Sequence, residues 1–209
     1  TDTLAVLQDK NIPIDVFVES TISIGAAAEY CLGAIERKAH IVLMNAEVDL
    51  ILGPLLRHEA IKQGVVVTSD AGDQHGVLSR MMEEIEMWGF DIVQAGNIKG
   101  FLNRYATPES LRHEAEIRKL SLDQCCAYTD GSKLNIEMAI IGNEYGLTPF
   151  VPGMEGPQCA TIEQAISLFD FDAYDGKGRV DYILGAKPGG GVYVVGKCAD
   201  EFQKHYLWY

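Results

Sequence analysis

Short, uniformly apolar runs that alternate with helical segments are the feature that most limits what this chain can fold into. Three such runs cover residues 14–18, 40–44 and 65–68, with helical patterns over 26–37 and about 53–63 between them. A half-exposed strand alternates apolar and polar residues, whereas a strand buried on both faces stays apolar. The pattern predicts an α/β fold with an incomplete Rossmann-like parallel sheet, covered by helices.

The pattern changes after residue 95. We expect residues 1–95 to form the C-terminal part of a dinucleotide-binding domain, and residues 96–209 to form an α+β region for substrate binding and oligomerisation. A helix is expected over 131–145 in the second region. Two further runs, 180–184 and 192–195, predict antiparallel strands.

Glycine and proline mark several expected boundaries. Gly53 and Pro54 predict a helix start, because proline suits the first helical turn. Residues 91–94 read as a strand and 96–103 as a loop. The glycine-rich segment 187–191 is followed by a strand rather than a helix, so we interpret it as a hairpin turn and not as a phosphate loop.

The charge and the cysteines limit the class of partner and the compartment. A formal charge of -13 argues against nucleic acid and anionic membranes as partners. It does not exclude a small substrate that is phosphorylated, because one local lysine or helix N-terminus can hold a phosphate. The five cysteines have no metal-ligand spacing, and the start shows no signal peptide. A reducing, cytoplasmic setting is the simplest interpretation.

Polar residues follow two of the expected strands at the point where each strand ends. Ser20 and Thr21 follow the first strand, and Asn45 and Ala46 follow the second. Ligands of open α/β sheets bind at the carboxyl ends of the strands, so we expect these residues to bind the nicotinamide end of NAD or NADP. The alternative is that Thr21 or Asn45 merely caps the following helix.

The phosphate-binding loop of a dinucleotide fold is missing from the sequence. No G-x-G-x-x-G occurs, although this motif normally follows the first strand of such a fold. We therefore expect this chain to be a fragment of a longer protein, with the start of the nucleotide-binding sheet ahead of Thr1.

A lysine and two carboxylates at the start of the expected helix are candidates for acid–base chemistry. Lys133 and Glu137 lie four residues apart and share one helical face, and Asp130 precedes the helix. A lysine kept charged by carboxylates could donate a proton to a carbonyl oxygen as hydride arrives. The alternative is an ordinary solvated ion pair.

The spacing of the histidines does not predict a metal site, because no two of them form an H-x-x-x-H pair. Loop carboxylates such as Asp70, Asp73 and Glu155 leave a divalent metal open.

Several segments resemble a known family. Residues 16–45 are similar to the second half of the nucleotide domain in homoserine dehydrogenases. The segments GDQHG (72–76), IEMAIIGNEYGL (136–147) and VPGMEGP (151–157) resemble a homoserine-dehydrogenase-like family, often associated with a SAF domain. That family includes a deoxyxylulose-phosphate reductoisomerase-like enzyme.

The resemblance implies hydride transfer between NAD(P)H and a small carbonyl compound. In the reductoisomerase-like branch, it implies conversion of 1-deoxy-D-xylulose 5-phosphate to 2-C-methyl-D-erythritol 4-phosphate. Lys133 falls where homoserine dehydrogenases place a catalytic lysine. Ala46 replaces the lysine of their Asn-Lys pair, which disfavours homoserine as the substrate. The residues that the resemblance assigns to substrate binding are Asp73, Lys99, Gly153 and Met154.

A different class of function stays open at this point. The chain could act as an assembly or ligand-binding module without catalysis, with the strands near Val180 and Val192 forming a sheet shared between subunits. A homodimer or higher homo-oligomer is the expected assembly, and symmetric dimers are the commonest oligomers.

Overall fold

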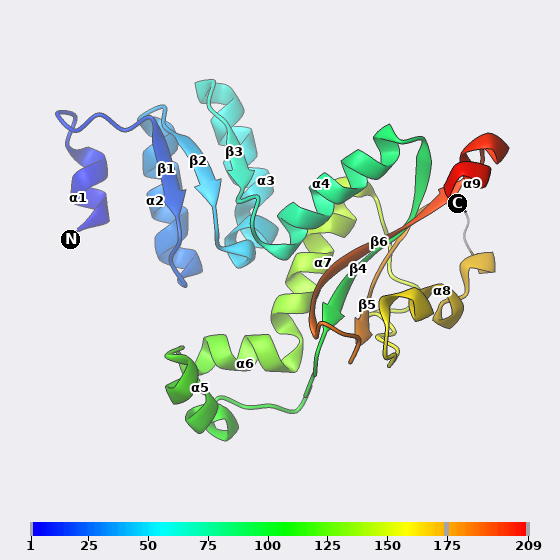
Figure 1. The fold of residues 1–209 in the computed structure, drawn as a ribbon. Helices are drawn as coiled ribbons and strands as arrows, with labels where there is room; N and C mark the ends of the chain where they lie inside the picture. The colour runs from blue at the N-terminus through cyan, green and yellow to red at the C-terminus, as the bar shows by residue number, and fades with distance from the viewer. Residues whose placement is uncertain (1, 174–175, 208–209) are drawn as a thin grey trace. The chain divides into compact units, whose positions relative to one another are not determined.

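The computed structural model describes residues 2–173 and 176–207, and the chain divides into two compact units (Figure 1). The first unit ends at Gly76 and the second begins at Val77. This division lies earlier than the boundary expected after residue 95. The strand expected over 91–94 is the start of a longer strand that belongs to the second unit's sheet.

The first unit contains a three-stranded parallel sheet, as the apolar runs predict. The strands are in the order β1-β2-β3, and both neighbouring pairs are parallel. Its elements are α1 (Thr3–Gln8), β1 (Val16–Glu19), α2 (Ile24–Glu36), β2 (His40–Leu43), α3 (Ala46–Gln63) and β3 (Val67–Ser69).

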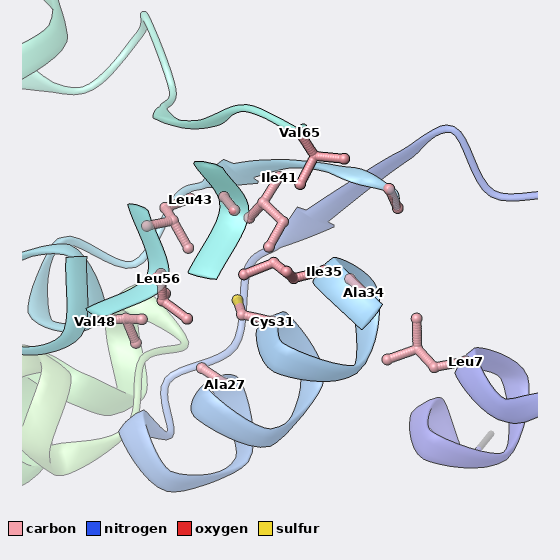
Figure 2. Close-up of a cluster of buried hydrophobic side chains, with 12 residues drawn as sticks. Leu7, Ala27, Cys31, Ala34, Ile35, Ile41, Leu43, Val48, Leu56 and Val65 are labelled. Carbon is pink, nitrogen blue, oxygen red and sulfur yellow. The ribbon is translucent and has the colours of Figure 1, made fainter. Parts of the chain in front are cut away.

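The core of this unit lies on one face of the sheet. Side chains from α2, β2 and α3, including Cys31, Ile41 and Leu56, gather there with Leu7 of α1 (Figure 2). On the other face, Val16 and Val18 are each 52% exposed. The expectation that helices cover the whole sheet is therefore wrong for this face. Uniformly apolar strands indicate that both faces of a sheet can be buried. In this unit, one face is exposed all the same.

Helix α3 begins at Ala46, so the expected helix start at Gly53 and Pro54 is wrong. Asn45 is the N-cap, and its side chain accepts a hydrogen bond from the Val48 N–H. Glu47 lies in the first turn, where a carboxylate interacts favourably with the helix dipole. These cap signals outweigh the proline, which lies inside the helix.

The second unit is built around a mixed sheet with the strand order β5-β4-β6. Its elements, beginning with the helix that leads in from the first unit, are α4 (Gln74–Met87), β4 (Phe90–Lys99), η1 (Glu109–Leu111), α5 (Arg112–Arg118), α6 (Leu122–Asp130), α7 (Ser132–Tyr145), η2 (Ile162–Gln164), α8 (Ala165–Leu168), η3 (Phe171–Ala173), β5 (Arg179–Leu184), β6 (Gly190–Cys198) and α9 (Glu201–Leu207).

Strand β4 is the central strand of this sheet, between β5 and β6, and its position corrects two expectations. It pairs in parallel with β5 and antiparallel with β6. Residues 96–99, expected in a loop, belong to β4. The segment 187–191 does not close a hairpin, because β5 and β6 pair with opposite edges of β4 rather than with each other. The helix and strands expected over 131–145, 180–184 and 192–195 are confirmed.

Both faces of this second sheet carry packed side chains. Leu78 of α4 and Met138 of α7 belong to a cluster on one face, together with Ala95 of β4. Ala165 of α8 packs with Ile98 on the opposite face. None of the helices within the described ranges is long and apolar enough to span a membrane.

Candidate functional site

The clearest candidate for chemistry is a lysine–carboxylate pair on helix α7. Lys133 Nζ lies 3.5 Å from Glu137 Oε1, and the two side chains are 19% and 3% exposed. The alternative of a solvated ion pair is therefore wrong, because Glu137 lies almost wholly inside the protein. A charge removed from water is costly unless it is paired and hydrogen-bonded, so this pair depends on its surroundings.

Strand β4 supplies a second partner for Glu137. Asn97 Nδ2 donates a hydrogen bond to Glu137 Oε2 at 3.4 Å, and Asn97 is completely buried. This bond uses the amide nitrogen. Asn97 Oδ1 is buried without a hydrogen-bond partner among the described residues. The pair therefore sits next to a carbonyl oxygen that can still accept a hydrogen bond.

Lys99 joins this group from the end of β4. Its Nζ donates a hydrogen bond to the Tyr128 carbonyl at 3.0 Å. Burial lowers the pKa of Lys99, and Lys133 also lowers it, while Glu137 and Asp130 raise it. These charge interactions indicate that Lys99, Lys133, Glu137 and Asp130 form one electrostatic group at the junction of β4 and α7.

Asp130 and Tyr128 border the group from helix α6. Asp130 Oδ1 accepts a hydrogen bond from the Ser132 N–H at 2.7 Å, so this carboxylate supports the start of α7. Lys133 Nζ lies 5.5 Å from the centre of the Tyr128 ring, which is within cation–π range. Lys133 is thus held by the Glu137 carboxylate and by the Tyr128 ring.

A cavity of about 570 Å³ opens at the carboxyl ends of β4 and β5. It begins at Gly100, the residue after Lys99. Leu102 is among its lining residues and also approaches Gly131 at the start of α7. The volume is in the range of small-molecule sites. The lining residues are Gly100, Phe101, Leu102, Gln158, Cys159, Ala160, Leu184 and Gly185.

The segment that contains Gly153 and Met154 leads to this cavity. Both residues have left-handed backbone conformations, with φ of 84° and 71°. Gly153 is exposed, whereas Met154 packs against the cluster that contains Tyr182 and Leu134. Met154 therefore has a clear packing role, and the cavity lining begins four residues later at Gln158.

In the first unit, Asn45 has a structural role. Besides capping α3, its Nδ2 donates a hydrogen bond to the Thr21 carbonyl at 2.8 Å. The helix-cap alternative is therefore confirmed for Asn45. It is not confirmed for Thr21, because the cap of α2 is Ser23. Ala46 is the first residue of α3 and is buried.

The carboxyl end of β1 has both exposed hydroxyls and a buried acid. Ser20 and Thr21 are exposed. Glu19 is 1% exposed, and its Oε1 accepts a hydrogen bond from the Thr21 N–H at 2.7 Å. Its Oε2 has no hydrogen-bond partner within the described ranges. This edge therefore has acceptor groups that can bind hydroxyl or amide donors of a ligand.

Asp73 lies at the end of the first unit, beside the start of α4. Its N–H donates a hydrogen bond to Asp70 Oδ2 at 3.0 Å, and its own carboxylate accepts one from the Gln74 N–H. The local turn therefore accounts for these contacts. Across residues 2–173 and 176–207, no group of three histidine, cysteine or acidic side chains has a geometry that could hold a metal ion.

Sequence reasoning missed Asn97 and Asp181. Each is completely buried in a strand of the second unit. The available signal was a polar residue inside a short apolar run, as in VDYIL around Asp181 and IVQAGNI around Asn97. A buried polar residue is more informative than a buried apolar one, because it needs a partner.

Comparison with known proteins places much of this chain in a family. A search of curated proteins gives no match. One similar solved structure, at 2.20 Å, is a protein of Archaeoglobus fulgidus with a provisional homoserine dehydrogenase name. The two share 18% identity and a TM-score of 0.48, over 67% of this chain and 46% of that protein. The chain thus spans less than half the length of that protein.

The match to a family is more extensive. Residues 72–209 match the family described as the catalytic domain of the oxidoreductase DRL. This range includes the Lys133–Glu137 pair and the residues that line the cavity. The chain belongs to this family of oxidoreductases.

Proposed function

We propose that the complete protein is an NAD(P)-dependent oxidoreductase that acts on a small carbonyl or hydroxy compound. The observation that carries this proposal is the Lys133–Glu137 pair, with its almost fully buried carboxylate, at the junction of β4 and α7. The cavity at the carboxyl ends of β4 and β5 is the proposed substrate site.

Lys133 is the proposed proton donor. When hydride adds to a carbonyl carbon, the carbonyl oxygen gains an electron pair and takes a proton, which the Lys133 ammonium can supply. Glu137 keeps the ammonium form favourable before transfer, and Asn97 keeps the carboxylate in place. The reverse reaction returns the proton to a neutral lysine.

The carboxyl edge of the first sheet is the proposed site for the nicotinamide end of the cofactor. Glu19 Oε2 is a buried acceptor without a partner in the described part of the chain, and Ser20 and Thr21 offer exposed hydroxyls. These groups fit the amide and hydroxyl donors of a nicotinamide riboside. The bound cofactor would supply the hydride. Titration of the complete protein with NADH and with NADPH tests which of the two cofactors it binds.

The test is the Lys133→Met variant of the complete protein, assayed with NADH and NADPH against a panel of phosphosugars and hydroxy or keto acids. We expect turnover to fall by about 10² to 10⁴, the usual contribution of a general acid. Lys197→Met is the matched control, because Lys197 is an exposed lysine of β6. If Lys133→Met keeps turnover within a factor of about ten, Lys133 is not the proton donor.

The first substrate to test is 1-deoxy-D-xylulose 5-phosphate. Support comes from the sequence resemblance to the reductoisomerase-like enzyme, and from Lys99 and Lys133, which can attract a phosphorylated compound. A homoserine-type substrate is the alternative, disfavoured by Ala46. Adding and chelating Mg²⁺ in the same assay tests a metal requirement. We further propose a cytoplasmic location, in keeping with five cysteines that are all free in the structure.

An assembly role is the second candidate, and the edge strand β6 favours it. This strand is nine residues long and pairs with β4 on one side. An unpaired strand edge can add a strand from a second copy. Analytical ultracentrifugation with cofactor titration separates the two candidates: a stable dimer that ignores NADH and NADPH favours assembly without catalysis.

A further inference from the structure

Asp181 is a buried carboxylate that the proposed proton transfer does not use. It lies within β5 and is completely buried, between Val180 and Tyr182, which are 4% and 6% exposed. A carboxylate in such a place is costly unless hydrogen bonds compensate for the lost water. Its partners therefore indicate what it holds in place.

All the hydrogen-bond partners of Asp181 in the described structure are backbone N–H groups. Glu155 donates to both carboxylate oxygens, at 3.1 and 3.0 Å, and Gly156 donates to Oδ1 at 2.9 Å. The adjacent Tyr182 N–H donates to Oδ1 at 2.8 Å. Burial raises the pKa of the Asp181 carboxyl, and these N–H groups partly offset that rise.

The segment that follows α7 pairs only partly with the outer edge of β5, and a side chain bonds to it where backbone pairing is missing. The segment that follows α7 meets the outer edge of β5 at two isolated bridges, Thr148 with Arg179 and Gln158 with Leu184. Between the bridges it leaves the edge. On its return, the N–H groups of Glu155 and Gly156 bond to the Asp181 carboxylate in place of a strand carbonyl.

The Tyr182 ring also restricts the path of the chain where it comes back to β5, at Gly156. Gly156 has φ of 58°, and a Cβ placed on it would lie 1.9 Å from the Tyr182 ring. The chain then passes directly into the cavity wall formed by Gln158, Cys159 and Ala160. Asp181 thus anchors the turn directly before this wall, and the wall itself bonds to Leu184 through the Cys159 N–H.

We infer that Asp181 is a positioning residue, which holds the Gly153–Gly156 turn and through it the Gln158–Ala160 wall of the substrate cavity. Its effect on substrate rests on the proposed function, whereas its effect on the wall does not. In Asp181→Asn, the amide nitrogen replaces an acceptor facing these N–H donors, so the turn is released on at least one side.

The first experiment measures the alkylation of Cys159 by iodoacetamide in the folded, complete protein, with mass spectrometry of each cysteine peptide. Cys198, partly buried in the same unit, is the internal reference. Asp181→Asn should increase the rate at Cys159 about tenfold by local opening, with Cys198 unchanged. Asp91→Asn, an exposed acid on β4, should change neither. An unchanged Cys159 rate, or an equal rise at both cysteines, overturns the proposal.

A second measurement needs no substitution and covers the case in which Asp181→Asn fails to fold. In the wild-type protein, the Glu155 and Gly156 amides should exchange with deuterium as slowly as amides of β5. Exchange as fast as at exposed Gly153 overturns the proposal.

Kinetics then connect the wall to substrate. Asp181→Asn should raise KM about tenfold and change kcat by less than about threefold, because the wall binds substrate but does not transfer the proton. A change in Cys159 reactivity without any oxidoreductase activity in the wild type would reject the proposed function and leave the wall inference intact. Activity with an unchanged KM would reject the role of Asp181 in substrate binding.

Discussion

The two sheets of this protein differ in how much of each is covered. The parallel sheet of the first unit is packed on one face and exposes Val16 and Val18 on the other. The mixed sheet of the second unit is packed on both faces, and seven consecutive residues of β4 are buried. Similar apolar strands therefore belong to an open sheet in one unit and a closed sheet in the other.

The two sheets also differ in the polar groups that they carry. A sheet covered on both faces can enclose Asn97, Glu137 and Asp181 away from water. There, charge interactions are stronger than at an exposed edge. The open sheet also buries polar groups at its carboxyl edge, Glu19 and Asn45, and it adds the exposed hydroxyls of Ser20 and Thr21. Under the proposed function, the proton donor lies in the second unit and the nicotinamide site in the first.

The sharpest test of the open face compares two substitutions in the first sheet. Ile41→Ala, on the packed face, should destabilise the protein by about 2–5 kcal/mol in urea unfolding, because Ile41 is completely buried. Val18→Ala, on the open face, should change stability by no more than about 0.5 kcal/mol. A large loss in Val18→Ala would mean that this face is covered in solution.

The closed sheet can be tested at Gly96 of β4. A Cβ at this position would lie 2.2 Å from the Tyr193 ring, so Gly96→Ala forces the tightly packed ring to move. We expect a loss of about 1–3 kcal/mol. Hydrogen exchange followed by mass spectrometry should locate the loss of protection in the second unit. Gly25→Ala, which meets nothing within 4 Å, is the control.

A smaller, pH-dependent effect is expected at Cys31 in the first unit. Burial, with a lesser effect of the Glu19 charge, raises the pKa of this thiol from 9.0 to about 12. Since the folded pKa is raised, the stabilisation is fully present below pH 9 and is lost as the pH rises from 9 towards about 12. The loss is at most about 1.4 kcal/mol per pH unit.

Urea unfolding at pH 7, 9 and 10 measures this effect. Cys31→Ala should show a smaller fall in stability between pH 9 and 10 than the wild type, since tyrosine ionisation is common to both proteins. Equal slopes would contradict a buried, protonated thiol at position 31.

The sequence predicted the parallel sheet well, because strand pattern and helix spacing are local properties. It ended β4 too early, after Gln94, because Gly96 and Asn97 resemble loop residues. Their place in a strand depends on distant partners: Gln94 accepts a hydrogen bond from Tyr193 Oη, and Gly96 makes room for that ring. Such contacts join residues that no local pattern connects.

The same limit applied to the candidate site. The spacing of Lys133 and Glu137 indicated a pair, but not that it would be buried. Asn97 and Asp181 were missed because their partners, Glu137 and the Glu155–Gly156 backbone, lie far away in the sequence. Burial of a polar side chain is a property of the folded chain, and the sequence supplies only the polar residue.

The central position of β4 has a consequence for how the second unit folds. Of the three strands in its sheet, β4 comes first in the sequence, and both of its neighbours follow much later. The Gln94–Tyr193 bond spans 99 residues. Closing so long a loop costs entropy before any strand contact compensates for it. During synthesis, the strand that becomes the innermost one must wait, unpaired, for its neighbours to leave the ribosome.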